Sequence, residues 1–395
     1  MHLALFLSGL AGGGAQRRMI TLAAGFADRG YGVDLVVADG HGPFRAAVPP
    51  TVNLIELGNR WQRIRGLRDR RGLWVPASTF ALSRYLRREQ PDALLATSNP
   101  ANLTALWARR LSGTGIPVAI SLNVHLSSAS RHGATRLLRW LARRCYPDAE
   151  AVIAISQGVA QDVAATADVR AERITVIQNP IDLAHVQRQA EARPPAFWPQ
   201  DGIPVILGVG KLKRQKDFTT LIEAFALFRR HCRARLVILG DGELRPALQK
   251  RARDLGIADD LLLPGFVTNP HACMARAALF VLSSAWEGFS NALLEALACG
   301  CPVVATDCPS GPREILADGA YGALVPVGDP QGMARAIGDV LDAPPERGRL
   351  RRRAAEFSMG PVVDRYLEIL SLLAQSARDA TEIMQRPAAD GVRHD

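Results

Sequence analysis

The feature that most constrains the fold is an alternation of short apolar runs with helical segments along almost the whole chain. Runs with strand character occupy residues 2–8, 30–37, 92–97, 117–122 and 151–155, and helical segments lie between them. Strands that alternate with helices of about this length form a parallel sheet with helices on both faces. The first part of the chain is therefore predicted to be an α/β domain with a Rossmann-like sheet.

The alternation pauses at residues 178–204, which contain five prolines, and then starts again. This stretch is predicted to be the linker between two domains. We place the domain boundaries at residues 1–180, 181–361 and 362–395, the last being a closing helix to about residue 385 followed by a frayed tail. The strands and the first helix of the second domain are predicted at residues 205–209, 236–239, 261–263, 280–283 and 302–305, and at 218–230.

Several classes of protein are disfavoured by composition. No apolar run reaches the ~18 residues that a membrane span requires. The first ten residues are largely apolar but do not begin with the basic region of a signal peptide, so a buried strand is expected there instead. The six cysteines lack the paired spacing of a zinc site, and we expect them to be reduced, small apolar side chains of a cytosolic protein.

The net charge of +10 lies entirely in the first half. Residues 1–190 hold 23 arginines, no lysine and 13 acidic residues, whereas residues 191–395 hold 25 basic and 25 acidic residues. Six of the arginines lie between Arg60 and Arg71. Such a patch attracts an anionic partner, which from charge alone is a lipid surface, a diphosphate or a nucleic acid. The alternative is an arginine-rich face that is simply solvated.

The most informative segment for chemistry is 287–295. A helix is predicted to begin near Ser290 or Asn291, and the free amides at its start suit a diphosphate. Glu295 lies about one turn inside that helix, where its carboxylate can accept hydrogen bonds from a ribose diol. Glu287 precedes the helix and is placed to meet the group beyond the phosphate. The alternative is a pair of surface glutamates beside an ordinary helix.

A basic loop is predicted after the first strand of the second domain. Lys211, Lys213 and Lys216 lie there, and they are three of only four lysines in the chain. Basic side chains at this position can neutralise a leaving diphosphate. The alternative is a solvated loop.

Two features of the first domain suit a ligand. A glycine run at residues 12–14, which includes Gly13 and Gly14, follows the first strand and permits close approach of the backbone to a ligand. It lacks the spacing of a dinucleotide fingerprint, although Asp39 lies near the end of the second strand. His125 follows the strand at 117–122 and is placed to face a ligand, although a purely structural histidine is the usual case.

Together these motifs resemble the retaining family 4 glycosyltransferases of GT-B fold. Glu287 and Glu295 form the E-x7-E pattern of that family. The resemblance spans most of the chain, and its other parts are the segments 12–14, 179–182, 211–216, 240–242, 264–267 and 319–322. The segment 310–316 resembles a subset that builds bacterial surface glycans on polyprenyl-diphosphate carriers.

The resemblance implies two Rossmann-like domains with a cleft between them and a C-terminal helix that closes the fold. The first domain would face the acceptor, and the second would bind the nucleotide sugar. The implied catalytic residues are Glu287, His125 and Lys216. The implied donor-binding residues are Gly13, Gly14, Lys211, Lys216, Phe266, Val267, Glu287, Phe289, Ser290, Asn291 and Glu295.

Within that set the resemblance implies separate roles. Glu295 would bind the ribose, Glu287 and His125 the donor sugar, and the backbone at 266–267 the base. Lys211, Lys216 and the glycine run would hold the phosphates. The family commonly has arginine where this chain has Lys211, which keeps the charge but loses the two-pronged hydrogen bond.

The expected activity is a metal-independent, retaining transfer from a UDP-sugar, which is a substrate, so that no cofactor is needed. The expected partners are a glycan or polyprenyl-diphosphate-linked acceptor and, through the Arg60 to Arg71 patch with its Trp61 and Trp74, an anionic membrane rather than a nucleic acid. The expected location is the cytoplasm, on the inner face of the membrane. Two alternatives stay open: a nicotinamide-dependent oxidoreductase that uses the glycine run and Asp39, and an inactive GT-B protein that binds glycans.

Overall fold

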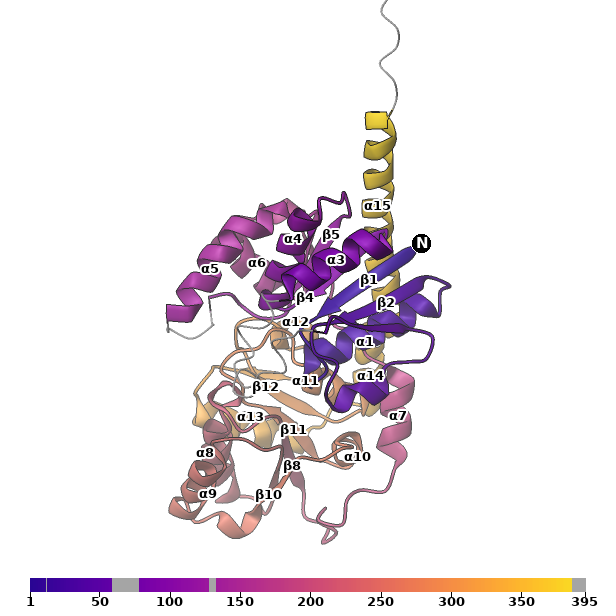
Figure 1. Cartoon of the computed structure of the whole chain (residues 1–395). Coiled ribbons are helices and arrows are strands. Elements are labelled where there is room, and N and C mark those ends of the chain that lie inside the picture. Colours follow the sequence, from indigo (N-terminus) through magenta and orange to yellow (C-terminus); the bar gives the residue numbers. More distant parts are fainter. Residues whose placement is uncertain (12, 59–77, 128–132, 386–395) are drawn as a thin grey trace, which may run out of the picture. The chain divides into compact units, whose positions relative to one another are not determined.

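The computed structural model describes residues 1–11, 13–58, 78–127 and 133–385, and these form two compact units (Figure 1). The sequence-based division at residues 180 and 361 differs from these units in three respects. The boundary near residue 180 lies after Ile177, residues 155–159 group with the second unit, and the C-terminal helix groups with the first from Val363 onward. The first unit contains Met1–Ala154, Ala160–Ile177 and the chain from Val363; the second contains Ile155–Val159 and Gln178–Val362.

Within the described residues, the first unit is built on a seven-stranded parallel sheet with the order β3-β2-β1-β4-β5-β6-β7. The central strand β1 pairs with β2 on one side and β4 on the other; Leu5, for example, lies opposite both Leu35 and Leu95. The strands are β1 (His2–Leu7), β2 (Gly32–Val37), β3 (Asn53–Glu56), β4 (Ala93–Thr97), β5 (Val118–Leu122), β6 (Ala151–Ala154) and β7 (Ile174–Val176).

Helix α15 (Met359–Gln385) returns to the first unit and packs on α1 (Gly14–Ala27). A Cβ atom added at Gly25 would lie 2.6 Å from Cγ2 of Val363, so the two helices are in close contact there. Arg29, two residues after the end of α1, also donates to Asp364 of α15 over 2.6 Å. The other α-helices of this unit are α3 (Thr79–Glu89), α4 (Asn99–Ser112), α5 (Gly133–Cys145) and, from Ala160 on, α6 (Gln157–Ala167).

The second unit has a six-stranded parallel sheet in the part described, with the order β10-β9-β8-β11-β12-β13. Its strands are β8 (Val205–Val209), β9 (Arg235–Leu239), β10 (Leu261–Gly265), β11 (Leu279–Leu282), β12 (Val303–Thr306) and β13 (Ala323–Val325). Its helices are α7 (Leu183–Glu191), α8 (Phe218–Arg229), α9 (Arg245–Asp254), α10 (His271–Met274), α11 (Asn291–Ala298), α12 (Pro312–Ile315), α13 (Pro330–Asp342) and α14 (Arg347–Ala355).

The predicted fold class, two Rossmann-like α/β sheets, is confirmed. In each sheet the first strand lies inside, and the strand order reverses beside it: between β1 and β4 in one unit and between β8 and β11 in the other. Ligands of open parallel sheets bind at the carboxyl ends of the strands, next to such a reversal. The loops predicted to carry chemistry follow β1, β5, β8 and β11, and so leave the sheets at these carboxyl ends.

The linker prediction for residues 178–204 is wrong in part, because α7 occupies its first half. Asp182 begins this helix as its N-cap, and its carboxylate accepts a hydrogen bond from the His185 amide over 2.9 Å. Such a cap satisfies one of the amide groups that a helix start leaves open. Val186 is the one buried residue of this helix, which explains why no apolar pattern in the sequence indicated it.

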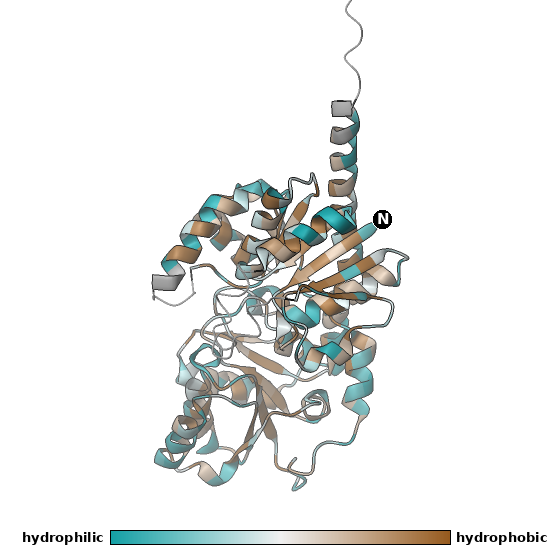
Figure 2. Ribbon diagram, viewed as in Figure 1, coloured by the Kyte–Doolittle hydropathy of each residue, from teal (hydrophilic) through white to brown (hydrophobic). Residues whose placement is uncertain are grey.

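Burial explains the strands and the cysteines. Most strand residues of both sheets are hydrophobic (Figure 2), as expected of sheets covered on both faces, whereas the edge strand β3 begins and ends with the exposed polar residues Asn53 and Glu56. Five of the six cysteines are buried and Cys232 is exposed. Burial raises the pKa of the Cys273 thiol to about 11. No described helix is long and apolar enough to cross a membrane. Nor do the described residues contain a group of three or more side chains suited to a metal ion.

The contact between α1 and α15 gives a first test. Gly25→Leu should lower the free energy of unfolding by about 1–3 kcal/mol, because the new side chain would overlap Val363. Urea unfolding followed by circular dichroism measures the change. Gly115→Leu is the control, because no atom lies within 4 Å of a Cβ at that position. Equal unfolding midpoints for the two variants would contradict the packing of α15 on α1.

Candidate functional site

Two of the predicted loops meet at the carboxyl ends of β8 and β11 in the second unit. The Ala285 amide donates to the Gln215 carbonyl over 2.9 Å, and Gln215 Nε2 donates to the Trp286 carbonyl over 3.0 Å. Ser283 Oγ donates to the Lys216 carbonyl over 2.8 Å. These bonds fix the basic loop after β8 against the loop that carries Glu287.

The centre of this junction is an ion pair. Lys216 Nζ lies 2.5 Å from Glu287 Oε1, and the two side chains are only 15% and 8% exposed. Ser284 Oγ donates to the same carboxylate oxygen over 2.7 Å, and Ser310 Oγ donates to the Glu287 carbonyl over 3.0 Å. The structure therefore brings together two of the three predicted catalytic side chains. The loops after three neighbouring strands, β8, β11 and β12, hold them in place.

Positive charge concentrates in the loop after β8. The pKa of the Lys213 ammonium is lowered, mainly because burial removes solvent around the amine and to a smaller extent because Lys216 and Lys211 repel it. The Glu287 carboxylate acts in the opposite direction. Crowded cations of this kind are stabilised by an anion that binds between them. Residue 240 has to be glycine where it packs against this loop, because a Cβ atom at that position would lie 1.9 Å from the Gly210 carbonyl oxygen.

Helix α11 begins at Asn291, as predicted, with Ser290 as its N-cap. Ser290 has φ of 71°, a left-handed conformation that costs a non-glycine residue energy and that clusters at functional sites. Its hydroxyl is buried, and within the described residues it has no hydrogen-bond partner. A buried hydroxyl and open amides at one helix start suit the oxygen atoms of a phosphate.

The neighbours of Ser290 do not all present side chains to a ligand. Phe289 is 1% exposed, and its ring packs against Phe357 with the centroids 5.7 Å apart. As a predicted donor-binding residue, Phe289 can thus contribute only its backbone, because its side chain belongs to the core. The amide side chain of Asn291 accepts a hydrogen bond from Asn179 over 2.8 Å.

Glu295 lies one turn into α11 and has a neighbour that the sequence did not indicate. His271, at the start of α10, is buried, and its Nε2 lies 3.4 Å from Glu295 Oε2. Neither ring nitrogen of His271 makes a hydrogen bond to a described residue. Its ring also meets His185 edge-on, with centroids 6.1 Å apart. Only the fold brings these residues together, because α7, α10 and α11 are far apart in sequence.

Phe266 and Val267 lie directly after β10, the outermost strand of the second sheet. The Phe266 ring is 81% exposed, which is unusual for a large apolar side chain. The Gly240 amide donates to the Gly265 carbonyl over 2.8 Å, so the loop after β9 supports this position. Phe266 and Val267 therefore share the carboxyl end of the sheet with the lysine loop but lie two strands away from it.

In the first unit, Gly13 is the N-cap of α1 and Gly14 its first residue. Gly13 has φ of 141°, which glycine tolerates best. His125 is buried, and its Nδ1 lies 3.6 Å from Oδ1 of Asp162, a residue that the sequence did not indicate. Burial opposes the charged form of Asp162, but the approach of His125 and hydrogen bonds from Ser127 outweigh it and lower the pKa of this carboxyl.

A third residue that the sequence did not indicate is Arg18, which is buried in the first unit. Its Nη2 donates to Thr97 Oγ1 over 2.9 Å, to Ser121 Oγ over 2.8 Å and to Asn123 Oδ1 over 2.5 Å. Asn123 in turn donates to Thr97 over 2.8 Å. This network ties the ends of β4 and β5 to α1, and so fixes the loop that carries His125.

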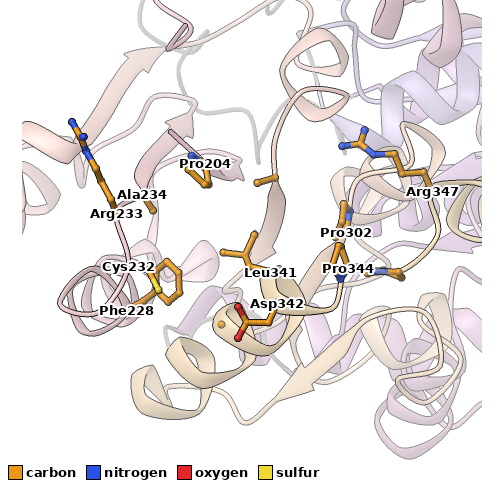
Figure 3. Close-up of a pocket in the computed structure, with 13 residues that line it drawn as sticks. Pro204, Phe228, Cys232, Arg233, Ala234, Pro302, Leu341, Asp342, Pro344 and Arg347 are labelled. Carbon is orange, nitrogen blue, oxygen red and sulfur yellow. The ribbon is translucent and has the colours of Figure 1, made fainter. Parts of the chain in front are cut away.

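Two features lie outside this arrangement. The predicted Arg60 to Arg71 patch falls outside the described residues. A cavity of about 610 Å³ opens in the second unit, and its lining includes the residues directly before β8, β9 and β12 (Figure 3): Pro204, Ala234 and Pro302. It therefore lies at the amino-terminal ends of the strands, and no predicted donor-binding residue lines it.

The Lys216–Glu287 pair generates a test of stability. Lys216→Met should lower the free energy of unfolding by about 3 kcal/mol, because it leaves the Glu287 carboxylate nearly buried without its cation. Adding Glu287→Gln should restore part of that loss. The matched control is Lys250→Met, whose exposed pair with Asp254 should contribute less than about 1 kcal/mol. Equal losses for the two lysine variants in urea unfolding would contradict a tightly held pair.

Two family models match the chain. The model described as Glycosyltransferase Family 4 matches residues 12–185, and the model described as Glycosyl transferases group 1 matches residues 192–357. The first match includes the glycine run and His125. The second includes the lysine loop, Glu287 and Glu295.

Known sequences give the same result. A lipopolysaccharide core biosynthesis glycosyltransferase of Rhizobium meliloti is 31% identical over 366 residues, which cover 91% of this chain and 96% of that protein. A Campylobacter jejuni N-acetylgalactosamine-N,N'-diacetylbacillosaminyl-diphospho-undecaprenol 4-alpha-N-acetylgalactosaminyltransferase is 33% identical over 207 residues. That second match covers 52% of this chain and spans only about half of the relative, 54% of its length.

Solved structures confirm the GT-B fold. The lipopolysaccharide outer core galactosyltransferase WaaB, in its apo form, has a TM-score of 0.72 at 23% identity and covers 94% of this chain and 99% of that one. The Anabaena protein HepE in complex with UDP has a TM-score of 0.72 at 21% identity, with 94% and 100% covered. From the two family models and the relative matched over nearly its whole length, the chain belongs to the family 4, group 1 glycosyltransferases.

Proposed function

We propose that the protein transfers a sugar from a UDP-sugar to a glycan acceptor carried on a polyprenyl diphosphate, with retention of the anomeric configuration and without a metal ion. The observation that carries this proposal is the Lys216–Glu287 pair beside the start of α11, where Ser290 has a buried hydroxyl without a partner among the described residues. A cation, a carboxylate and open helix amides at one place match a sugar joined to a diphosphate.

The phosphate part of the donor would lie on the lysine loop. Lys211 and Lys216 supply positive charge, and the amides of α11 supply hydrogen-bond donors with the positive end of the helix dipole behind them. These groups stabilise negative charge as it develops on the leaving UDP, which is the step that a transferase has to accelerate. Because they are fixed by the loops after β8 and β11, little reorganisation is needed during the reaction.

The sugar and the nucleoside would lie on either side of the phosphates. Glu287 accepts hydrogen bonds from the donor sugar hydroxyls, and His125 is proposed to bind the same sugar. Glu295 accepts hydrogen bonds from the ribose diol, while the backbone after β10 holds the base. The ring of Phe266, being exposed, is available for stacking on that base.

In the proposed reaction an acceptor hydroxyl attacks the anomeric carbon from the side of the leaving group. The new bond forms from the acceptor oxygen to that carbon, and the bond from the carbon to the β-phosphate oxygen breaks. The acceptor proton passes to a β-phosphate oxygen, so UDP leaves with it. Attack from this face retains the configuration at the anomeric carbon.

The named relatives support the choice of donor and acceptor. UDP and UDP-glucose occupy structures of the Anabaena protein, and the Campylobacter relative is named for a diphospho-undecaprenol substrate. Four of the relatives are named for lipopolysaccharide glycosyl transfer or core biosynthesis. A lipid-linked acceptor lies in a membrane, and the excess positive charge in the first half of the chain suits binding at such a membrane. In this proposal the Arg60 to Arg71 patch binds the anionic membrane surface.

A donor screen tests the proposal. UDP-sugars should raise the melting temperature of the protein, NAD should not, and the product formed on a polyprenyl-diphosphate acceptor should gain the mass of one sugar. Stabilisation by NAD alone would favour the oxidoreductase alternative. Binding of glycans with no transfer from any nucleotide sugar would favour an inactive glycan-binding protein.

Lys216→Ala should reduce turnover. Loss of a charge-assisted contact to the diphosphate costs about 1.5–3 kcal/mol, which corresponds to a fall of roughly 10- to 150-fold in kcat/KM. Steady-state assay of UDP release measures this effect, and Lys250→Ala, the lysine outside the loop, serves as the control. An unchanged kcat/KM for the Lys216 variant would contradict the phosphate role.

Glu295→Gln should weaken UDP binding more than it weakens folding, because the ribose diol loses a charged acceptor. Calorimetric titration with UDP should show a Kd raised by about tenfold or more, with a melting temperature close to that of the parent. Glu223→Gln is the matched control, since Glu223 pairs with Arg251 away from the lysine loop. Equal UDP affinity in parent and Glu295 variant would refute the assignment.

A further inference from the structure

Helix α5 lies in a stretch of the chain with one sign of charge. Residues 93–147 contain seven arginines and no aspartate or glutamate. Four of these arginines, at positions 136, 139, 143 and 144, belong to α5. A surface helix that lacks acidic residues cannot neutralise its arginines from within, so their charge is directed at its surroundings.

The burial pattern divides α5 into two faces. Ala142 and Cys145 are buried, and Arg139 anchors the helix by donating to the Leu126 carbonyl over 3.0 Å. On the opposite face Trp140 is 63% exposed and Leu137 is 58% exposed. Two large apolar side chains exposed next to each other on one helix turn are unusual in a surface that meets only water.

The arginines surround these two apolar side chains. With 3.6 residues per turn, Arg136 and Arg144 lie one turn before and after Trp140, and Arg143 lies beside it at a spacing of three. All three arginines are exposed. The outward face of α5 is therefore a tryptophan and a leucine framed by three guanidinium groups, and hydrophilic and hydrophobic bands follow each other along its ribbon (Figure 2).

These arginines differ from others nearby. On α4, Arg109 pairs with Glu150 and Arg110 with Asp148. Considering only the described part of the chain, no carboxylate forms an ion pair with Arg136, Arg143 or Arg144. The exposed face of α5 is thus positively charged and lacks an internal counter-charge.

We propose that the outward face of α5, comprising Arg136, Leu137, Trp140, Arg143 and Arg144, binds an anionic membrane surface. Tryptophan is favoured at the boundary between lipid headgroups and acyl chains, where its ring is buried and its N–H stays hydrogen-bonded. Arginines beside it reach the phosphates of the headgroups while their stems cover apolar surface. A tryptophan also stacks on unpaired bases, but the leucine beside it gains nothing from a nucleic acid and is buried by a lipid surface, so the two together favour a membrane.

The biological role of membrane binding by α5 rests on the proposed lipid-linked acceptor. The binding itself does not depend on sugar transfer. It is also separate from the Arg60 to Arg71 patch, which is a different segment of the chain. Vesicle binding measured without donor or acceptor therefore tests α5 alone. Failure of the proposed transfer would leave that result unchanged.

The experiment is co-sedimentation of the whole protein with vesicles of phosphatidylcholine alone or with added phosphatidylglycerol. The parent should bind only the vesicles with phosphatidylglycerol and should be released by high salt. Each arginine contributes about fivefold to such binding, so Arg136→Gln, Arg143→Gln and Arg144→Gln together should weaken it by about a hundredfold. Leu137→Ser with Trp140→Ser should weaken it by about tenfold or more.

Matched controls separate α5 from general charge and hydrophobicity. Arg230→Gln, Arg233→Gln and Arg335→Gln remove three exposed arginines of the second unit, and Leu372→Ser removes an exposed leucine of α15. These variants should bind vesicles as the parent does, and all variants should keep the melting temperature of the parent because the altered side chains are exposed.

Three results would overturn the membrane assignment of α5. The first is a parent protein that ignores phosphatidylglycerol vesicles at low salt. The second is equal vesicle binding by the α5 variants and the control variants. The third is binding of single-stranded RNA that is lost in the arginine variant while vesicle binding is kept, which would assign the same face to a nucleic acid.

Discussion

A nearly buried ion pair between Lys216 and Glu287 is the interaction on which the candidate site depends. It joins the loop after β8 to the loop after β11 at the place where the strand order of the second sheet reverses. The backbone around it is correspondingly constrained, with Ser290 in a left-handed conformation and Gly240 packed against the Gly210 carbonyl. Breaking the pair would leave a nearly buried charge without its counter-ion, so sequence changes at either residue affect both the site and the fold.

The central strands of each sheet and the edge strand β10 were predictable from the sequence, whereas the other three edge strands, β3, β7 and β13, were not. Strands such as β4 and β5 are buried at every position and therefore read as continuous apolar runs. The outer strands β3, β7 and β13 have only three or four residues and are mostly half-buried, so they leave no such run. Helix α7 was not predicted for a related reason. It lies in a proline-rich stretch and buries only Val186, so it has no apolar pattern.

The candidate site divides in the same way. Residues carried by a local motif, such as the lysine loop and the E-x7-E segment, were evident from spacing. His271, Asp162 and Arg18 were not, since each becomes relevant only when elements distant in sequence come together. Nor did spacing reveal that the ring of Phe289 belongs to the core beside Phe357, because the same residue type serves packing and recognition.

Arginine has two different uses in this chain. On α14, Arg353 donates to the Glu314 and Ile315 carbonyls at the end of α12, and Arg351 donates to the Cys299 carbonyl after α11, so these arginines satisfy helix ends. On α5, the exposed arginines have no such acceptor within the described residues and surround apolar side chains instead. The number of arginines therefore does not indicate whether the protein has an anionic partner. The local surroundings of each arginine do.

The central claim is that the carboxyl ends of β8 and β11 bind the diphosphate of a nucleotide sugar. A crystal structure of the protein with UDP tests it most directly. The account predicts the diphosphate between the lysine loop and the amino terminus of α11, within hydrogen-bond distance of Lys216 and the Ser290 hydroxyl, and the ribose beside Glu295. UDP bound instead in the cavity at the opposite ends of these strands, or on the first unit alone, would contradict it.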